Sequence, residues 1–178
     1  MERKIFKGGE FLITEVSKND VFVPEEFSDE QKQIGNTTED FVVKEVMPHQ
    51  EEIEHQNFDI VVKLMNKCGE LGLLMIDAPE EYGGLELDKV TSMLAAEKIA
   101  PAGSFSVTYA AHTGIGTLPL VYYGTKEQKE KYLNKIISGE WVAAYCLTEP
   151  DAGSDALSCK TTATLSEDGK YYILNGTN

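Results

Sequence analysis

The spacing of apolar residues changes once along this chain, at Trp141. Before Trp141 they recur every three or four positions, which is typical of amphipathic helices. After it, short apolar runs are separated by turn residues, which is typical of strands. A domain boundary at about residue 140 follows. The sequence therefore predicts a mostly α chain with an arm at 1–27, an all-α helical domain at 28–140 and an incomplete, strand-containing domain at 141–178.

Capping and breaking residues mark the ends of the expected helices. Ser28 with Gln31, and Thr125 with Gln128, have the spacing of capping boxes. The helices are expected to begin near Ser28, Asn57, Asp88, Ser104 and Thr125, and to end near Pro48, Gly69 or Gly72, Ala100, His112 and Gly139.

Two of these helices carry further expectations about packing. In the helix that follows Asp88, we expect Val90, Met93 and Leu94 to face the core. The helix that begins at Ser104 is rich in small residues. It could line a cavity or simply pack in the core.

The strand region contains a loop suited to a polar ligand. Trp141 to Thr148 has no charge and is expected to be a buried or half-buried strand, which Pro150 ends. Gly153 permits a positive φ and a close backbone approach, so N–H groups and the hydroxyls of Thr148 and Ser154 could bind phosphate or a ring edge.

Two features weigh against a ligand loop at this position. Glu149, Asp151 and Asp155 would repel an anion unless they point away from it. An ordinary surface turn is the alternative, because turns commonly use the same residue types. After the loop, Lys160 to Leu165 and Lys170 to Leu174 are expected to pair as a hairpin.

Composition excludes several classes of function. The formal net charge of −14 disfavours binding to nucleic acid or an anionic membrane. Cys68, Cys146 and Cys159 are odd in number and widely spaced, which indicates a reducing compartment rather than a disulfide framework or a zinc site.

The histidines and the uncharged stretch have structural explanations. The three histidines have no metal-ligand spacing, so no metal is expected, and His112 is predicted to be a hydrogen-bonded core residue. The uncharged stretch 101–125 is interrupted by Pro119 and several glycines, which favours a buried helix and turn over a membrane span. The N-terminus lacks the pattern of a signal peptide, so a cytoplasmic protein is expected.

Several motifs resemble one family. They are Leu147-Thr148-Glu149-Pro150-x-Ala152-Gly153-Ser154-Asp155, Pro79-Glu80-Glu81-Tyr82-Gly83-Gly84, His112-x-Gly114-Ile115-Gly116 and Tyr123-Gly124-Thr125-Lys126-Glu127-Gln128-Lys129. In this order they are similar to segments of the acyl-CoA dehydrogenases. The residues Lys170-Tyr171-Tyr172 resemble those of the very-long-chain branch of that family.

The resemblance implies a fold and a cofactor. Family members have an N-terminal helical domain, a middle β-barrel domain and a C-terminal helical bundle, so this chain would hold the first domain and the opening strands of the barrel. FAD would be contacted by Tyr145, Cys146, Leu147, Thr148, Glu149, Pro150, Asp151, Ala152, Gly153 and Ser154. Thr148 would lie near the isoalloxazine, and Ser154 near the pyrophosphate or the bound acyl-CoA substrate.

The resemblance also implies a reaction. It is the α,β-dehydrogenation of an acyl-CoA to a trans-2-enoyl-CoA in fatty acid β-oxidation, with an electron-transferring flavoprotein as electron acceptor and a homodimer or homotetramer as the assembly. The catalytic glutamate is expected beyond Asn178, so no catalytic residue is assigned and the chain alone is expected to be inactive. An acyl-CoA oxidase and a non-catalytic helical interaction module are the alternatives.

Overall fold

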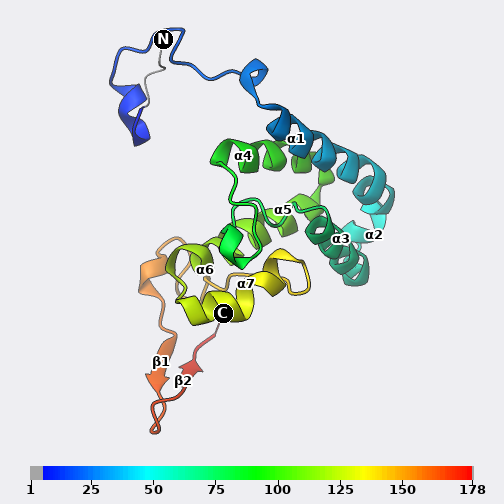
Figure 1. Ribbon diagram of the computed structural model, residues 1–178. Helices are drawn as coiled ribbons and strands as arrows, with labels where there is room; N and C mark the ends of the chain where they lie inside the picture. Colours follow the sequence, from blue (N-terminus) through cyan, green and yellow to red (C-terminus); the bar gives the residue numbers. More distant parts are fainter. Residues whose placement is uncertain (1–5, 178) are drawn as a thin grey trace.

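The computed structural model describes residues 6–177, so residues 1–5 of the predicted arm and Asn178 lie outside it. The described residues form a helical body, from which the arm and a β-hairpin project at opposite ends (Figure 1). The helices are α1 (Asp29–Phe41), α2 (Gln50–Glu54), α3 (Phe58–Glu70), α4 (Lys89–Ile99), α5 (Ser104–Ala111), α6 (Leu118–Tyr123) and α7 (Lys126–Ile137); the strands are β1 (Thr162–Leu165) and β2 (Tyr172–Asn175). This confirms the predicted mostly α fold with strands at its end.

The predicted helix starts are largely confirmed. The Ser28 hydroxyl accepts a hydrogen bond from the Gln31 N–H at 3.1 Å, and Gln31 accepts one in return from the Ser28 N–H at 2.9 Å. Thr125 forms the same capping box at the start of α7. Ser104 was expected to cap α5 but lies inside it, and its hydroxyl instead donates to Glu54 at 2.8 Å.

One predicted helix end is wrong, and a second is correct for Gly72 but not for Gly69. The helical path continues past Pro48, through a π-helical turn at Val42–Val46 and a 3₁₀ turn at Met47–His49, into α2. Proline is tolerated there because it lies at the start of the 3₁₀ turn, where its missing N–H is not needed. Gly69 lies inside α3, and a Cβ on it would lie 1.9 Å from the Ser138 carbonyl oxygen. Close packing therefore requires this glycine, and α3 ends before Gly72, whose φ is +75°.

The main core lies between α1, α3, α4 and α5. Phe105 is fully buried, and its ring centroid lies 5.9 Å from that of Phe41. The expected inward face of α4 is correct only for Leu94, since Val90 is 37% and Met93 67% exposed. The helix instead buries Thr91, Leu94, Ala95 and Ile99, which lie along one stripe.

The predicted hairpin is confirmed, but the predicted strand before it is wrong. β1 and β2 pair antiparallel, with Thr162 opposite Asn175 and Leu165 opposite Tyr172. Trp141 to Thr148 forms no strand, and Trp141 and Tyr145 are 43% and 50% exposed. A strand needs a neighbour for its backbone groups, and none of residues 6–177 supplies one here. Within the same range no helix has the length and apolar character needed to cross a bilayer.

Candidate functional site

His112 joins the helical body to the segment that carries the candidate loop. It is 1% exposed and lies at the start of a π-helical turn, His112–Gly116, that follows α5. Its Nδ1 accepts a hydrogen bond from the Ala143 N–H at 3.0 Å, and its Nε2 lies 3.1 Å from the Ile136 carbonyl oxygen. Nδ1 is therefore the acceptor and Nε2 the donor, which is the neutral tautomer. Burial lowers the pKa of His112, so the ring stays neutral, and the predicted hydrogen-bonded core histidine is confirmed.

Further contacts hold the same segment against the helices. A Cβ on Gly116 would lie 2.8 Å from the Ala143 Cβ, so the π-helical turn and the segment approach each other closely. The Trp141 N–H donates to the Lys135 carbonyl at 2.9 Å, and Lys135 Nζ lies 4.6 Å from the Trp141 ring centroid. The path that leads to the loop is therefore set by α7 and by the turn after α5.

The candidate loop begins with a tight two-residue turn. Glu149 and Ala152 exchange two backbone hydrogen bonds, both of 3.1 Å, around Pro150 and Asp151. Ala152 is 2% exposed, which makes it the buried end of this turn. The turn reverses the chain, as Pro150 predicted.

The three loop carboxylates are held by the residues that follow the loop. Glu149 accepts hydrogen bonds from the backbone N–H groups of Lys160 at 2.6 Å and Thr161 at 3.0 Å. Hydrogen bonds from Thr161 and the Lys160 backbone lower the Glu149 pKa, which keeps the carboxylate charged. Asp151 pairs with Lys160 Nζ at 2.8 Å, and Asp155 accepts from the Ser158 hydroxyl. Each acidic side chain thus has a partner within residues 158–161, and Lys160 serves two of them.

The other part of the loop is open. A Cβ on Gly153 would meet no atom within 4 Å, and Thr148 and Ser154 are exposed. Gly153 does not use the positive φ that glycine permits, since its φ lies outside the left-handed region. The glycine therefore leaves space beside the loop rather than relieving strain within it. Tyr145, Cys146 and Leu147, also predicted to contact the flavin, are exposed along the same approach to the loop.

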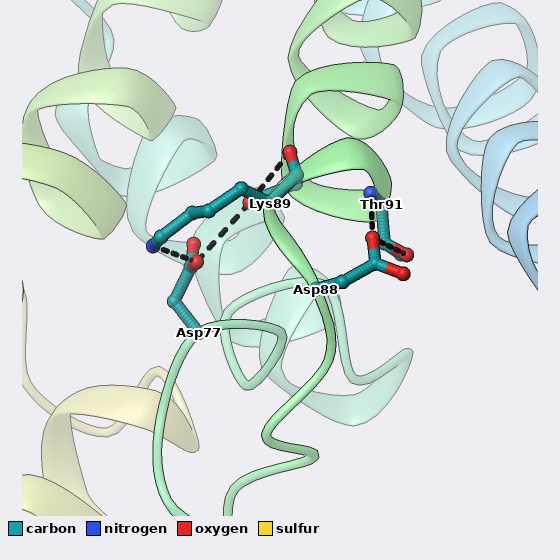
Figure 2. Close-up of polar contacts among 5 residues, drawn as sticks. Asp77, Asp88, Lys89 and Thr91 are labelled. Atoms are coloured by element: carbon teal, nitrogen blue, oxygen red, sulfur yellow. Dashed lines mark hydrogen bonds and ion pairs between the residues drawn. The ribbon is translucent and has the colours of Figure 1, made fainter. Parts of the chain in front are cut away.

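A separate cavity of about 340 Å³ lies between α4, α5 and the loop at 73–78. Ala110 of α5 and Thr113 of the π-helical turn after it line this cavity. Phe105 of α5 packs in the core instead, so both expectations for this helix hold on different faces. At its edge Asp77 pairs with Lys89 (Figure 2). The residues that line this cavity include none of the candidate loop.

The contacts that hold the loop were not foreseen from the sequence. Lys160 and Thr161 close the loop from 11 and 12 positions away from Glu149, and His112 binds Ala143 across 31 positions. The motif Lys160-Thr161 is a signal that could have drawn attention to the first contact. No local pattern links His112 to Ala143.

The chain matches known proteins along most of its length. The sequence profile described as "Acyl-CoA dehydrogenase, N-terminal domain" matches residues 28–140. A probable acyl-CoA dehydrogenase of Bacillus subtilis is 55% identical over 170 residues, which are 96% of this chain and 29% of that protein. A second one from Bacillus subtilis, YngJ, is 40% identical over 152 residues, or 85% of this chain and 39% of that protein.

A solved structure agrees with these sequences. The acyl-CoA dehydrogenase from Bacillus anthracis, crystallised with FAD, superposes with a TM-score of 0.93 at 55% identity. The superposition covers 97% of this chain and 30% of that one. This chain thus spans about three tenths of two of these relatives and two fifths of the third. On this evidence, the chain belongs to the acyl-CoA dehydrogenase family.

Proposed function

We propose that residues 1–178 are the N-terminal part of an FAD-dependent acyl-CoA dehydrogenase, and that Tyr145 to Ser154 contact the flavin. The carrying observation is the loop, whose acidic side chains are held by residues 158–161 while its glycine and hydroxyls stay open. Family membership supports the same proposal.

The residues present fit FAD on two physical grounds. The space beside Gly153 admits a phosphate close to backbone N–H groups. The partners of Glu149 and Asp151 reduce the repulsion that a pyrophosphate would meet there. We therefore assign backbone N–H groups and the Ser154 hydroxyl to the pyrophosphate or the acyl-CoA, and the Thr148 hydroxyl to the isoalloxazine.

The reaction is the oxidation of an acyl-CoA thioester to its trans-2-enoyl product. FAD supplies the two-electron acceptor for this chemistry. The described residues bind and orient; they include no assigned base, and we expect the catalytic glutamate beyond Asn178. Fixed donors beside the flavin would polarise the thioester carbonyl and so favour loss of the α-proton.

The wider setting of the enzyme is part of the proposal. We infer a role in fatty acid β-oxidation in the cytoplasm, electron transfer to an electron-transferring flavoprotein, and a homodimer or homotetramer. The lean toward very-long-chain substrates and the division into 1–27, 28–140 and 141–178 stay predictions.

The visible spectrum of the purified full-length gene product tests this function. We expect a flavin band that bleaches when an acyl-CoA is added under anaerobic conditions. Rapid recovery of the band in air would identify an oxidase instead. A colourless protein that gains no flavin band when FAD is added would favour the non-catalytic interaction module.

Gly153→Val in the full-length protein tests the loop. The Cβ of the new side chain meets no atom of the described chain within 4 Å, so the fold should persist. FAD content should fall at least about tenfold, equivalent to about 1.4 kcal/mol of binding free energy. Gly114→Val is the matched control, because a Cβ there also meets nothing within 4 Å, and it should retain FAD. Normal flavin content in Gly153→Val would contradict the loop assignment.

Thr148→Val tests whether the Thr148 hydroxyl alters the flavin spectrum and reduction rate without being required for FAD binding. It removes one hydroxyl and preserves the shape of the side chain. We expect retained FAD with a shifted flavin absorption maximum or a slower reduction by substrate. An unchanged spectrum and reduction rate would place Thr148 outside the flavin site.

A further inference from the structure

The arm, residues 6–27, carries apolar side chains that the described chain leaves in solvent. Phe11, Leu12, Ile13 and Val16 are 53%, 75%, 90% and 39% exposed. They lie within six consecutive positions, in and after the 3₁₀ turn Gly8–Leu12. A contiguous exposed apolar segment of this kind usually marks an interaction site.

The arm is locally structured but projects away from the helical body. The Ile13 N–H and the Thr14 hydroxyl both donate to the Glu10 carbonyl, so these hydrogen bonds stay within the arm. Figure 1 shows the arm leading away from the start of α1. Near its base, the Phe22 and Phe27 ring centroids lie 5.5 Å apart. The exposed apolar residues are therefore presented beyond the body rather than folded onto it.

The Bacillus anthracis structure supports a defined course for this arm. Residues 6–27 are 22 of the 178 residues, or about 12% of the chain. A TM-score of 0.93 over 97% of the chain leaves too little deviation for a segment of that size to point elsewhere. An arm with so few contacts to its own body keeps one course only if something else holds it.

The lengths of the relatives indicate what holds it. YngJ matches 152 residues and so leaves 26 of 178 unmatched, about the length of the arm, and the family profile begins at residue 28. The other Bacillus subtilis protein matches 170 residues. Since 170 residues are 29% of that protein and 152 are 39% of YngJ, the relative that retains the arm is longer by about half. The arm therefore accompanies an additional stretch of chain.

We propose that Phe11, Leu12, Ile13 and Val16 dock into an apolar groove of this additional segment within the same protein. The inference rests on the proposed function only in taking residues 1–178 as part of a longer chain. The charged residues around this apolar segment are of both signs, namely Lys7, Glu10, Glu15 and Lys18, so apolar contact rather than charge carries the docking. A second copy's helical body is the poorer occupant, because YngJ is a member of the same family and yet leaves 26 residues of this chain unmatched, about the length of the arm.

Site-specific photo-crosslinking in the full-length gene product tests the docking. Ile13 is replaced by p-benzoylphenylalanine, the protein is irradiated, and the crosslinked peptides are identified by mass spectrometry. We expect intramolecular crosslinks to the segment that shorter relatives lack. Crosslinks to residues 28–178, or between two copies in a mixture of isotopically light and heavy protein, would overturn the proposal.

Hydrogen exchange with matched variants gives a second readout. Ile13→Asp should speed exchange of the amides at 10–16 at least about tenfold without changing exchange in α1. Lys18→Asp, an exposed position without an apolar side chain, should change it less than about twofold. Equal exchange in Ile13→Asp and the unmodified protein would overturn the docking. Both readouts are independent of flavin: a colourless protein with the expected crosslinks would refute the proposed function alone.

Discussion

The helical body, 28–140, and the segment that follows it, 141–177, differ in where their apolar side chains lie. In the body Met65, Phe105 and Leu133 are fully buried, whereas Ile173 and Leu174 are 61% and 73% exposed in the hairpin. The body therefore closes its own core. The hairpin is held by its ladder and turn, and a two-stranded sheet is marginal without a packed face. The candidate loop thus lies at the junction of a self-sufficient region and a region that relies on partners.

Removing the central core side chain should have the largest effect on this comparison. Phe105→Ala deletes a fully buried ring that packs on Phe41, and we expect it to lower the free energy of unfolding by about 3–5 kcal/mol. Urea denaturation of the 178-residue chain measures this. Phe58→Ala is the control, because that ring is 68% exposed, and it should change stability by less than about 0.5 kcal/mol. Equal losses would contradict the assignment of the core.

Removing the His112 hydrogen bonds, which join the segment at Ala143 to the helical body, should have the next largest effect on stability. His112→Leu leaves the Ala143 N–H and the Ile136 carbonyl without their side-chain partner, at a cost of about 2–3 kcal/mol. His49→Gln, at a histidine whose side chain is 44% exposed, should cost less than about 0.5 kcal/mol. Amide exchange at Ala143 should rise in His112→Leu only. Unchanged protection there would contradict the junction.

The same histidine should make stability depend on pH. Burial lowers the His112 pKa from 6.5, so the unfolded chain takes up this proton first as the pH falls. The His112 contribution is therefore complete above about pH 6.5 and is lost as the pH falls toward the folded-state pKa. Urea titrations between pH 7.5 and 5 should show this decline. The part due to His112 should be absent in His112→Leu, and an identical pH dependence would contradict it.

Loss of the Ser28 cap at the start of α1 should lower the free energy of unfolding by a smaller amount. Ser28→Ala removes the acceptor for the Gln31 N–H at the start of α1, at a cost of about 1 kcal/mol. Ser28→Thr keeps a hydroxyl and should stay within about 0.5 kcal/mol of the original. Thermal or urea unfolding measures both. A loss of equal size in both variants would mean that the cap is not what stabilises the helix.

The smallest effect is expected in the hairpin. Ile173→Thr replaces a side chain that is 61% exposed with another β-branched residue, so stability should change by less than about 0.5 kcal/mol. Urea unfolding of the 178-residue chain is again the measurement. A loss above about 1 kcal/mol would show that the hairpin buries Ile173 and would weaken the comparison.

Local patterns mispredict the structure where distant parts of the chain decide the outcome. Val90 and Met93 share an apolar stripe, but α4 turns the neighbouring stripe of Thr91 and Leu94 toward the core. Glycine commonly ends a helix, but Gly69 lies within α3, where the absence of a side chain allows Ser138 to approach closely. Intrinsic pattern is a weak guide where two faces of a helix are both partly apolar.

The sequence alone determined what depends on neighbouring residues. The capping boxes at Ser28 and Thr125 connect residues three positions apart, and the hairpin between 160 and 174 turns over a short polar loop. Family membership was also evident from the motif Leu147 to Asp155. The caps form their hydrogen bonds within three positions, and the hairpin register is set by the short turn between its strands.

Only the tertiary structure decided how the candidate site is held. It showed that Glu149 turns toward Lys160 and Thr161, that His112 binds Ala143, and that Gly153 faces open space. These contacts join residues separated by 11 to 31 positions. The contact of His112 with Ala143 depends on how the helical body packs and on burial of His112, which excludes water as a competing partner. No local pattern encodes that packing.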